Sequence, residues 1–136
     1  MMPARTVYRT GADVNSSSTR FTQSFLEQKR RQLIALRAAL KRALDSQARE
    51  EKAIQDVSGE AHEYEEEAQK LAMLELDQNL ADRTAARLAR VERAVQKIDE
   101  GTYGVSDASG ELISIERLNA VPEAIYTLEE QQARDS

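Results

Sequence analysis

Residues 24–43 read SFLEQKRRQLIALRAALKRA, and this stretch decides the predicted fold. Ser24 and Glu27 have the spacing of a capping box, in which the serine oxygen accepts an early backbone N–H and the glutamate reaches back. The apolar positions that follow are spaced by seven, three or four residues: Leu26, Leu33, Leu36, Leu40 and Ala43. This heptad-like stripe predicts a long helix that begins at Ser24 and has one apolar face.

A second helical pattern follows a break at Gly59, because glycine adopts the left-handed conformation that ends many helices. Its apolar positions are Leu71, Leu74, Ala81, Leu88, Val91, Val95 and Ile98. Gly101 ends this pattern. The chain therefore contains two long amphipathic segments joined by a short connection.

The two stripes are related by symmetry about His62. Facing residues of an antiparallel hairpin lie at equal sequence distances from its turn, and short connections favour antiparallel neighbours. The pairs that meet this condition are Leu26 with Ile98, Leu33 with Val91, Leu36 with Leu88, and Ala43 with Ala81. The sequence predicts an all-α fold built on a long antiparallel coiled-coil hairpin. Its arms would be roughly 50 Å long at the helical rise of about 1.5 Å per residue, with a tip near residues 58–68.

Composition supports paired helices and excludes several classes of site. Of the 136 residues, 32% are charged and only 4% are aromatic, which is typical of long helices rather than a large globular core. The net charge of −5 argues against nucleic acid as a direct, specific partner. The absence of cysteine makes disulfides and thiolate metal sites impossible. No stretch is apolar enough to span a membrane. No catalytic motif occurs in the sequence, so we expect no enzymatic activity.

Three segments are predicted along the chain. Residues 1–23 lack periodicity and contain a serine run, which predicts a disordered N-terminal tail. Residues 24–100 form the hairpin. Residues 101–136 are predicted to form a small globular base, in which Pro122 begins a C-terminal helix that continues to Gln132. The expected packing residues of this base are Tyr103, Val105, Ile113, Leu118, Ile125 and Tyr126.

The predicted tip concentrates acidic side chains. Six acids and no Lys or Arg occur from Asp56 to Glu67, whereas residues 26–52 hold eight basic side chains and four acidic ones. One interpretation is a solvated turn whose acids favour the N-terminus of the second helix. The other is a probe that presents carboxylates to a basic pocket or to Mg²⁺, which prefers oxygen ligands.

Residues 103–113, YGVSDASGELI, form a glycine-bracketed turn with serine at the two ligand positions of a zinc knuckle. Together with Glu100-Gly101 and with RLNAVPEAIY at residues 117–126, this turn resembles the C-terminal zinc-finger module of the DksA/TraR family. The family pattern is E-G-x-Y-G-x-C-x-x-C-G-E-x-I followed by R-L-x-A-x-P-x-A-x-Y-C-x-x-C. The resemblance covers the final module in motif and the preceding hairpin in architecture.

The resemblance implies that all four zinc-binding cysteines of the family are replaced in this chain. Their positions are occupied by Ser106, Ser109, Thr127 and Glu130. A serine hydroxyl stays protonated near neutral pH and cannot substitute for a thiolate, so we expect a zinc-finger-like base without metal or cofactor. A structural zinc contributes roughly 10–16 kcal/mol in small fingers. Packing and hydrogen bonds must supply the stability of this base instead.

The resemblance also implies a partner and a site. Members of the DksA/TraR family bind bacterial RNA polymerase, and their coiled coil enters its secondary channel so that acidic tip residues approach the active site. The corresponding positions in this chain are Glu63, Glu66 and Ala68. We expect a cytoplasmic, monomeric, zinc-independent regulator of transcription in the stress response. Guanosine tetraphosphate is a further ligand that the resemblance suggests, without identifying the residues that would bind it here.

Two alternatives stay open. The chain could be a helical protein–protein interaction module that has kept the scaffold but not the polymerase function. It could instead assist transcript cleavage, because the Gre factors, which are similar in shape, place an acidic hairpin tip in the same channel.

Overall fold

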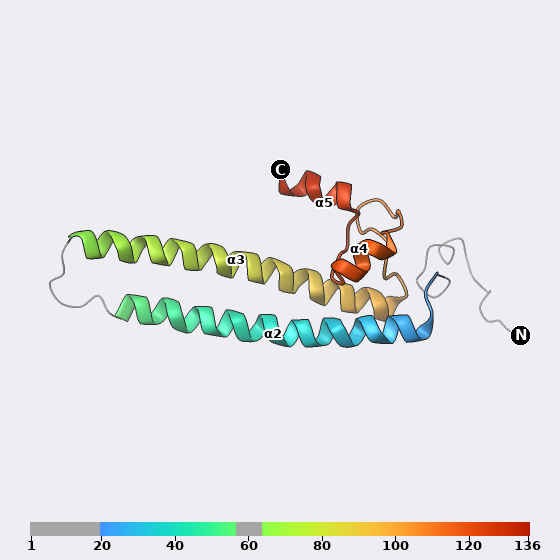
Figure 1. Cartoon of the computed structure of the whole chain (residues 1–136), viewed down its shortest axis with the longest axis horizontal. Coiled ribbons are helices and arrows are strands. Elements are labelled where there is room, and N and C mark those ends of the chain that lie inside the picture. Colours follow the sequence, from blue (N-terminus) through green and yellow to red (C-terminus); the bar gives the residue numbers. More distant parts are fainter. Residues whose placement is uncertain (1–19, 57–63) are drawn as a thin grey trace, which may run out of the picture. The chain divides into compact units, whose positions relative to one another are not determined.

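The computed structural model describes residues 20–56 and 64–136. The helices of these residues are α2 (Gln23–Asp56), α3 (Tyr64–Glu100), α4 (Ile115–Ala120) and α5 (Leu128–Asp135), which Figure 1 labels. None of these helices is long and apolar enough to cross a membrane. The connection between α2 and α3, with the predicted turn at His62, lies outside the described residues.

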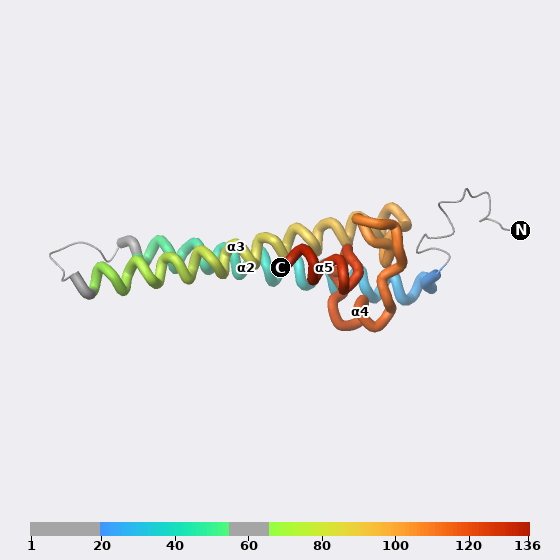
Figure 2. Tube along the Cα trace, turned by 90° about the horizontal axis from the view of Figure 1, so that it is seen from above, coloured from blue at the N-terminus to red at the C-terminus, as the bar shows by residue number. Residues whose placement is uncertain are grey.

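The chain divides into two compact units. The base unit comprises Met1–Leu36 and Arg90–Ser136, and the arm unit comprises Arg37–Ala89. Helices α2 and α3 each contribute a segment to both units. In each unit the two segments run side by side in opposite directions (Figures 1 and 2). The predicted all-α fold, with its antiparallel coiled-coil hairpin, is confirmed.

Helix α2 is capped by a different residue from the one that the capping-box pattern predicts. The Oγ1 of Thr22 accepts the backbone N–H of Phe25 at 3.0 Å, and the Thr22 carbonyl accepts the N–H of Leu26 at 3.1 Å. These bonds satisfy N–H groups that the first helical turn leaves without intrahelical partners. The prediction that Ser24 caps the helix was wrong, because Ser24 already lies inside the first turn.

The predicted C-terminal boundary of the disordered tail, residue 23, lies too late in the sequence. Phe21 is only 9% exposed and belongs to the core of the base unit. Its ring centroid lies 4.7 Å from that of Phe25 and 6.1 Å from that of Tyr103, so three aromatic rings cluster at the start of α2. The tail prediction is therefore corrected for residues 20–23, whereas residues 1–19 lie outside the described part of the chain.

The predicted seam is well buried in the base unit. Leu33 and Val91, which the symmetry about His62 pairs, are both fully buried. Ala94 and Val95, which follow Val91 on α3, are also buried. Removing a large aliphatic side chain from water contributes roughly 1.5–3 kcal/mol before entropy is counted. This seam is a principal source of stability for the paired helices of the base.

The arm unit has a more polar seam than the sequence predicts. The positions of α3 that are buried or half-buried follow a heptad spacing through Leu74, Asp77, Ala81 and Thr84. Leu71 stands one position away from this register and is exposed, so its assignment to the seam was wrong. Periodicity in apolar residues alone misses a register in which polar side chains occupy two of the seam positions.

Three glycines allow the chain to turn in residues 101–136. Gly101, Gly104 and Gly110 all have positive φ, a conformation that other residues rarely adopt. Val105, which follows Gly104, forms an isolated antiparallel bridge with Leu112, which follows Gly110. Of the six predicted packing residues, four are buried and two, Val105 and Tyr126, are half-buried. The buried ones are Tyr103, Ile113, Leu118 and Ile125.

The C-terminal helix forms, but it begins later than the position of Pro122 predicts. The Pro122 carbonyl accepts a hydrogen bond of 2.8 Å from the Tyr103 hydroxyl, in a turn that precedes the helix. Burial, together with the nearby Glu123 carboxylate, raises the pKa of the Tyr103 hydroxyl. Helix α5 begins at Leu128, directly after Thr127, whose side chain caps it.

Candidate functional site

Ser106 organises the turn in which the sequence suggested a zinc knuckle. Its hydroxyl donates a hydrogen bond of 2.6 Å to the Oε1 of Glu130. The same Oγ accepts the backbone N–H groups of Ala108 and Ser109 at 3.0 and 3.2 Å. Ser106 is buried, so each of these bonds satisfies a polar group that would otherwise be costly to bury.

Glu130 and Thr127 form a complete capping box at the start of α5. The Thr127 Oγ1 accepts the Glu130 N–H at 3.2 Å, and the Glu130 Oε1 accepts the Thr127 N–H at 2.9 Å. Hydrogen bonds from the hydroxyls of Ser106 and Ser109, and from the backbone and side chain of Thr127, lower the pKa of Glu130 to about 2. The carboxylate is therefore ionised at neutral pH.

The four predicted zinc-ligand positions thus meet around one carboxylate. Ser106 and Thr127 hydrogen-bond to Glu130, joining the knuckle turn to the start of α5, and Ser109 lies near enough to help lower the pKa of that carboxyl. A metal ion in such a module makes the same connection between two chain segments. Among the described residues, no three His, Cys, Asp or Glu side chains are grouped so that they could hold a metal ion.

A second ionic link fixes the knuckle turn to α3. Arg93 donates two hydrogen bonds to the Asp107 carboxylate, from Nε to Oδ2 at 2.7 Å and from a terminal nitrogen to Oδ1 at 3.0 Å. Lys97, which is almost completely buried, donates to the same Oδ1 at 2.7 Å. The hydrogen bond from Arg93, supported by those from Lys97 and by the charges of both cations, lowers the pKa of Asp107 to about 2. The Asp107 backbone N–H also donates to the Ile125 carbonyl.

Arg20 ties the start of the described chain to the same module. Its guanidinium donates to the carbonyls of Gly104 at 3.1 Å and Ile113 at 2.6 Å. The guanidinium also lies 4.7 Å from the centroid of the Phe21 ring, within cation–π range. Sequence reasoning missed Arg20 and Phe21, because no local periodicity marks residues whose partners lie more than 80 positions along the chain.

The predicted tip residues are only partly within the described chain. Glu66 and Ala68 lie in the first turns of α3, and both are exposed. Glu63 lies outside the described residues. Acidic side chains at a helix N-terminus interact favourably with its dipole, which gives Glu66 a local structural role besides any contact with a partner.

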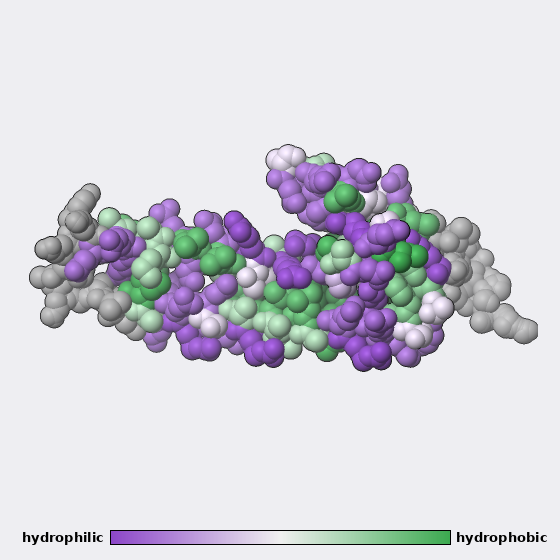
Figure 3. Space-filling view, viewed as in Figure 1, coloured by the Kyte–Doolittle hydropathy of each residue, from purple (hydrophilic) through white to green (hydrophobic). Residues whose placement is uncertain are grey.

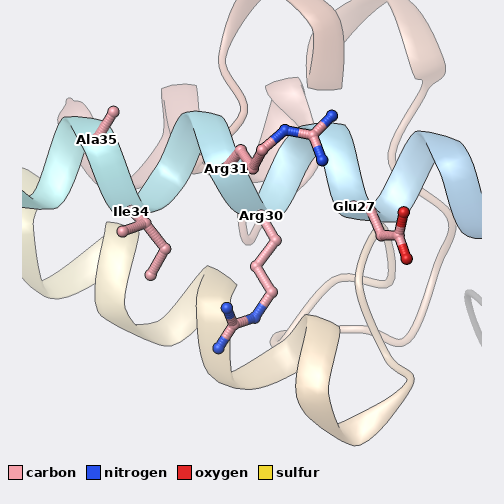
Figure 4. A pocket seen from close by; sticks show the side chains of 5 residues that line it. All are labelled: Glu27, Arg30, Arg31, Ile34 and Ala35. Carbon is pink, nitrogen blue, oxygen red and sulfur yellow. The ribbon is translucent and has the colours of Figure 1, made fainter.

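The described residues of the base unit line at least two cavities. One, of about 450 Å³, is lined entirely by α2 residues: Glu27, Arg30, Arg31, Ile34 and Ala35. Figure 4 shows that the Arg30 and Arg31 guanidinium groups point in different directions, and Arg30 is already paired with Asp99 at 3.1 Å. The two arginines therefore do not converge on a single anion.

The second cavity, of about 210 Å³, is more polar. Its lining residues are Arg90, Arg117, Val121, Ala124, Gln131 and Asp135. Arg117 is anchored by a 3.0 Å hydrogen bond from its Nε to the Tyr126 carbonyl. Arg90 has no ion pair or side-chain hydrogen bond within the described chain, which leaves its charge available to a ligand.

The fold consists of a long antiparallel helical hairpin and a small base shaped like a zinc finger, and these two features define a class of protein. The structure is similar to that of transcription factor DksA2 from Pseudomonas aeruginosa, with a TM-score of 0.65 at 20% identity over 83% of this chain and 84% of that one. An uncharacterized protein of Aquifex aeolicus is 30% identical over 105 residues, covering 76% of this chain and 72% of its own length. In fold this chain is DksA-like, and it contains no cysteine.

Two further relatives match over shorter regions. General stress protein 16O of Bacillus subtilis is 46% identical over 55 residues, and the RNA polymerase-binding transcription factor DksA of Caulobacter vibrioides is 28% identical over 60 residues. These matches cover 40% and 44% of this chain, and they span only 34% and 42% of the relatives' own lengths. No family model matches the chain.

Proposed function

We propose that this protein regulates transcription by binding bacterial RNA polymerase through the secondary channel. The observation that carries the proposal is the similarity to DksA proteins, one of which is named as an RNA polymerase-binding transcription factor. The helical hairpin supports it, because a slender pair of helices suits entry into a narrow channel. The protein would act as a monomer in the cytoplasm and would not itself be an enzyme.

The proposed contact with the active site is the start of α3. Glu66 and Ala68 are exposed there, so a partner can reach them without unfolding the helix. Glu66, together with Glu63, would place negative charge near the catalytic centre and alter the lifetime of promoter complexes. The resemblance implies that family members carry aspartate at these two acidic tip positions. Glutamate is one methylene longer than aspartate, so the charge is retained while its reach is greater.

The hydrogen-bonded knuckle suggests the condition in which this regulator serves the cell. Its base is held by Ser106, Thr127 and Glu130 rather than by thiolates, which are oxidised by peroxide. We propose that it stays folded when zinc is scarce or oxidants are abundant. A match to a protein named as a general stress protein agrees with such a role.

Guanosine tetraphosphate is proposed as a further ligand, without residues assigned to it. The cavity that Arg90 and Arg117 line measures about 210 Å³, below the roughly 300–1,000 Å³ of usual small-molecule pockets, and it also contains the Asp135 carboxylate, which opposes a polyanion. Calorimetry with the nucleotide, for the free protein and for its polymerase complex, tests this proposal. No heat of binding in either sample would refute it.

The function is tested with purified core polymerase. Retention of the protein on immobilised polymerase, and its displacement by a Gre factor, are expected if both use the secondary channel. A protein that does not bind polymerase would instead fit the helical interaction module. Shortening of transcripts in stalled complexes, dependent on this protein, would identify it as a cleavage factor.

A further inference from the structure

A small groove lies in the arm unit, where α2 and α3 run side by side. Its volume is about 120 Å³, and its lining residues are Glu50, Ile54, Met73, Leu76, Asp77 and Leu80. Pockets for small molecules usually measure about 300–1,000 Å³. This groove is large enough for the end of one protein side chain and too small for a typical cofactor.

The α3 wall of the groove exposes three large apolar side chains. Met73, Leu76 and Leu80 are 54%, 62% and 42% exposed. They are spaced by three and four residues, so they lie on one face of the helix. Figure 3 shows apolar patches set among hydrophilic side chains over the arm. An apolar patch with a polar rim is typical of a surface that binds another protein.

A carboxylate in the groove lacks the partner that its burial requires. Asp77 is only 7% exposed, and its Oδ2 is buried without a hydrogen bond. No ion pair or hydrogen bond within the described chain involves this side chain, and no Lys or Arg lines the groove. Buried carboxylates are ordinarily paired with a cation or a donor, so this site lacks positive charge.

We infer that this groove receives a lysine or arginine of RNA polymerase, carried on a segment whose neighbouring residues are aliphatic. The inference rests on the proposed function and adds a docking site to it. The basic head group would pair with Asp77 and Glu50, while the aliphatic neighbours cover Met73, Leu76 and Leu80. Charge complementarity selects a basic partner segment, and the exposed apolar side chains supply the contact area.

A second copy of this chain is a poorer occupant. A symmetric dimer would place the same face of each copy against the other. Asp77 and Glu50 of one copy would then approach those of its twin, and like charges in a desolvated interface are unfavourable. The groove therefore favours a partner of opposite charge.

The first experiment separates the charge of Asp77 from the stability of the arm. Asp77→Asn removes the charge with little change in shape, and Glu75→Gln removes a charge from an exposed residue of the same helix as the matched control. We expect Asp77→Asn to weaken polymerase binding roughly tenfold or more, with no fall in melting temperature. Glu75→Gln should bind as the parent does.

The second experiment tests the apolar wall. Leu76→Ser changes a groove residue, and Leu71→Ser changes an equally exposed leucine of α3 that does not line the groove. The groove variant should lose affinity and the control should keep it. Because both leucines are exposed, neither substitution should alter the melting temperature appreciably.

Each outcome decides between the two claims. Parental protein that fails to bind polymerase overturns both the proposed function and the groove. Parental protein that binds, together with Asp77→Asn and Leu76→Ser variants that bind equally well, overturns the groove alone. A lower melting temperature accompanying the loss of binding would show that Asp77 only supports the seam, and this result also overturns the docking site.

Discussion

The hydroxyl of Ser106 lies 2.6 Å from the Oε1 of Glu130, and this hydrogen bond joins two residues that are 24 positions apart. It connects the knuckle turn to the first turn of α5, at positions that the family pattern assigns to zinc ligands. A charge-assisted hydrogen bond of this length is stronger than a bond between neutral groups. In this base a carboxylate that accepts several donors makes the connection between the two segments.

Acid should weaken this link and the ionic clamp on Asp107 together. The pKa values of Glu130 and Asp107 are lowered to about 2 from ordinary values of 4.5 and 3.8. A depressed folded-state pKa stabilises the fold above the ordinary value, and this contribution is lost as the pH falls toward the folded value. Urea titrations between pH 5 and 2 should show falling stability. The Glu130→Gln/Asp107→Asn variant should be less stable near neutral pH, with a flatter dependence over this range.

The purified protein should contain no stoichiometric zinc, and a chelator should leave its melting curve unchanged. Replacing Ser106, Ser109, Thr127 and Glu130 all by Cys should create a protein that binds one zinc and loses stability on chelation, because these positions already meet. Elemental analysis and melting with and without chelator provide the measurement. One zinc per parental chain would contradict the prediction, whereas the Ser106→Cys/Ser109→Cys variant is the control expected to bind zinc weakly.

Val91→Asp should unfold the seam of the base. Val91 is fully buried, so the substitution places an unpaired charge among apolar side chains and should cost about 3–5 kcal/mol. Ala89→Asp adds the same charge two residues earlier at an exposed position and should change stability little. Thermal melts followed by circular dichroism distinguish them. Equal melting temperatures would show that the helix pairing is misassigned.

Gly104→Ala should be more damaging than Gly110→Ala. Both glycines have positive φ, so each substitution incurs strain on the order of 1–2 kcal/mol. A Cβ at Gly104 would also lie 2.8 Å from the Phe21 ring, whereas a Cβ at Gly110 has no neighbour within 4 Å. Chemical denaturation should show a larger loss for Gly104→Ala. Identical losses would mean that Phe21 moves aside at no cost.

Substituting the acidic tip should separate binding from regulation. The Glu63→Ala/Glu66→Ala variant should keep its stability, since Glu66 is exposed, and should keep most of its affinity for polymerase. Its effect on transcription from a sensitive promoter should fall, because the tip is the part proposed to reach the active site. Glu75→Ala/Glu92→Ala provides a control with the same change in charge. Unaltered regulation by the tip variant would favour a solvated acidic turn.

Local patterns predicted the helical hairpin because heptad spacing is a property of neighbouring residues. The leucine stripe around Leu33, its partner stripe around Val91 and the ends at glycine are all readable along the chain. The missing cysteines were equally plain, since the glycines and the Arg117-Leu118 pair preserve the surrounding motif. These features carried the resemblance to the DksA/TraR family and predicted the candidate positions at Ser106 and Glu130.

Tertiary structure decided what occupies those positions and what surrounds them. Arg20 reaches the carbonyls of Gly104 and Ile113 across 84 and 93 positions, and no local pattern encodes such a contact. The burial of Asp77 likewise depends on which face of α3 meets α2. Apolar spacing alone assigned Leu71 to that face, and this assignment was wrong. Helix formation follows short-range periodicity, whereas the pairing of polar groups depends on distances that exist only once the segments have packed together.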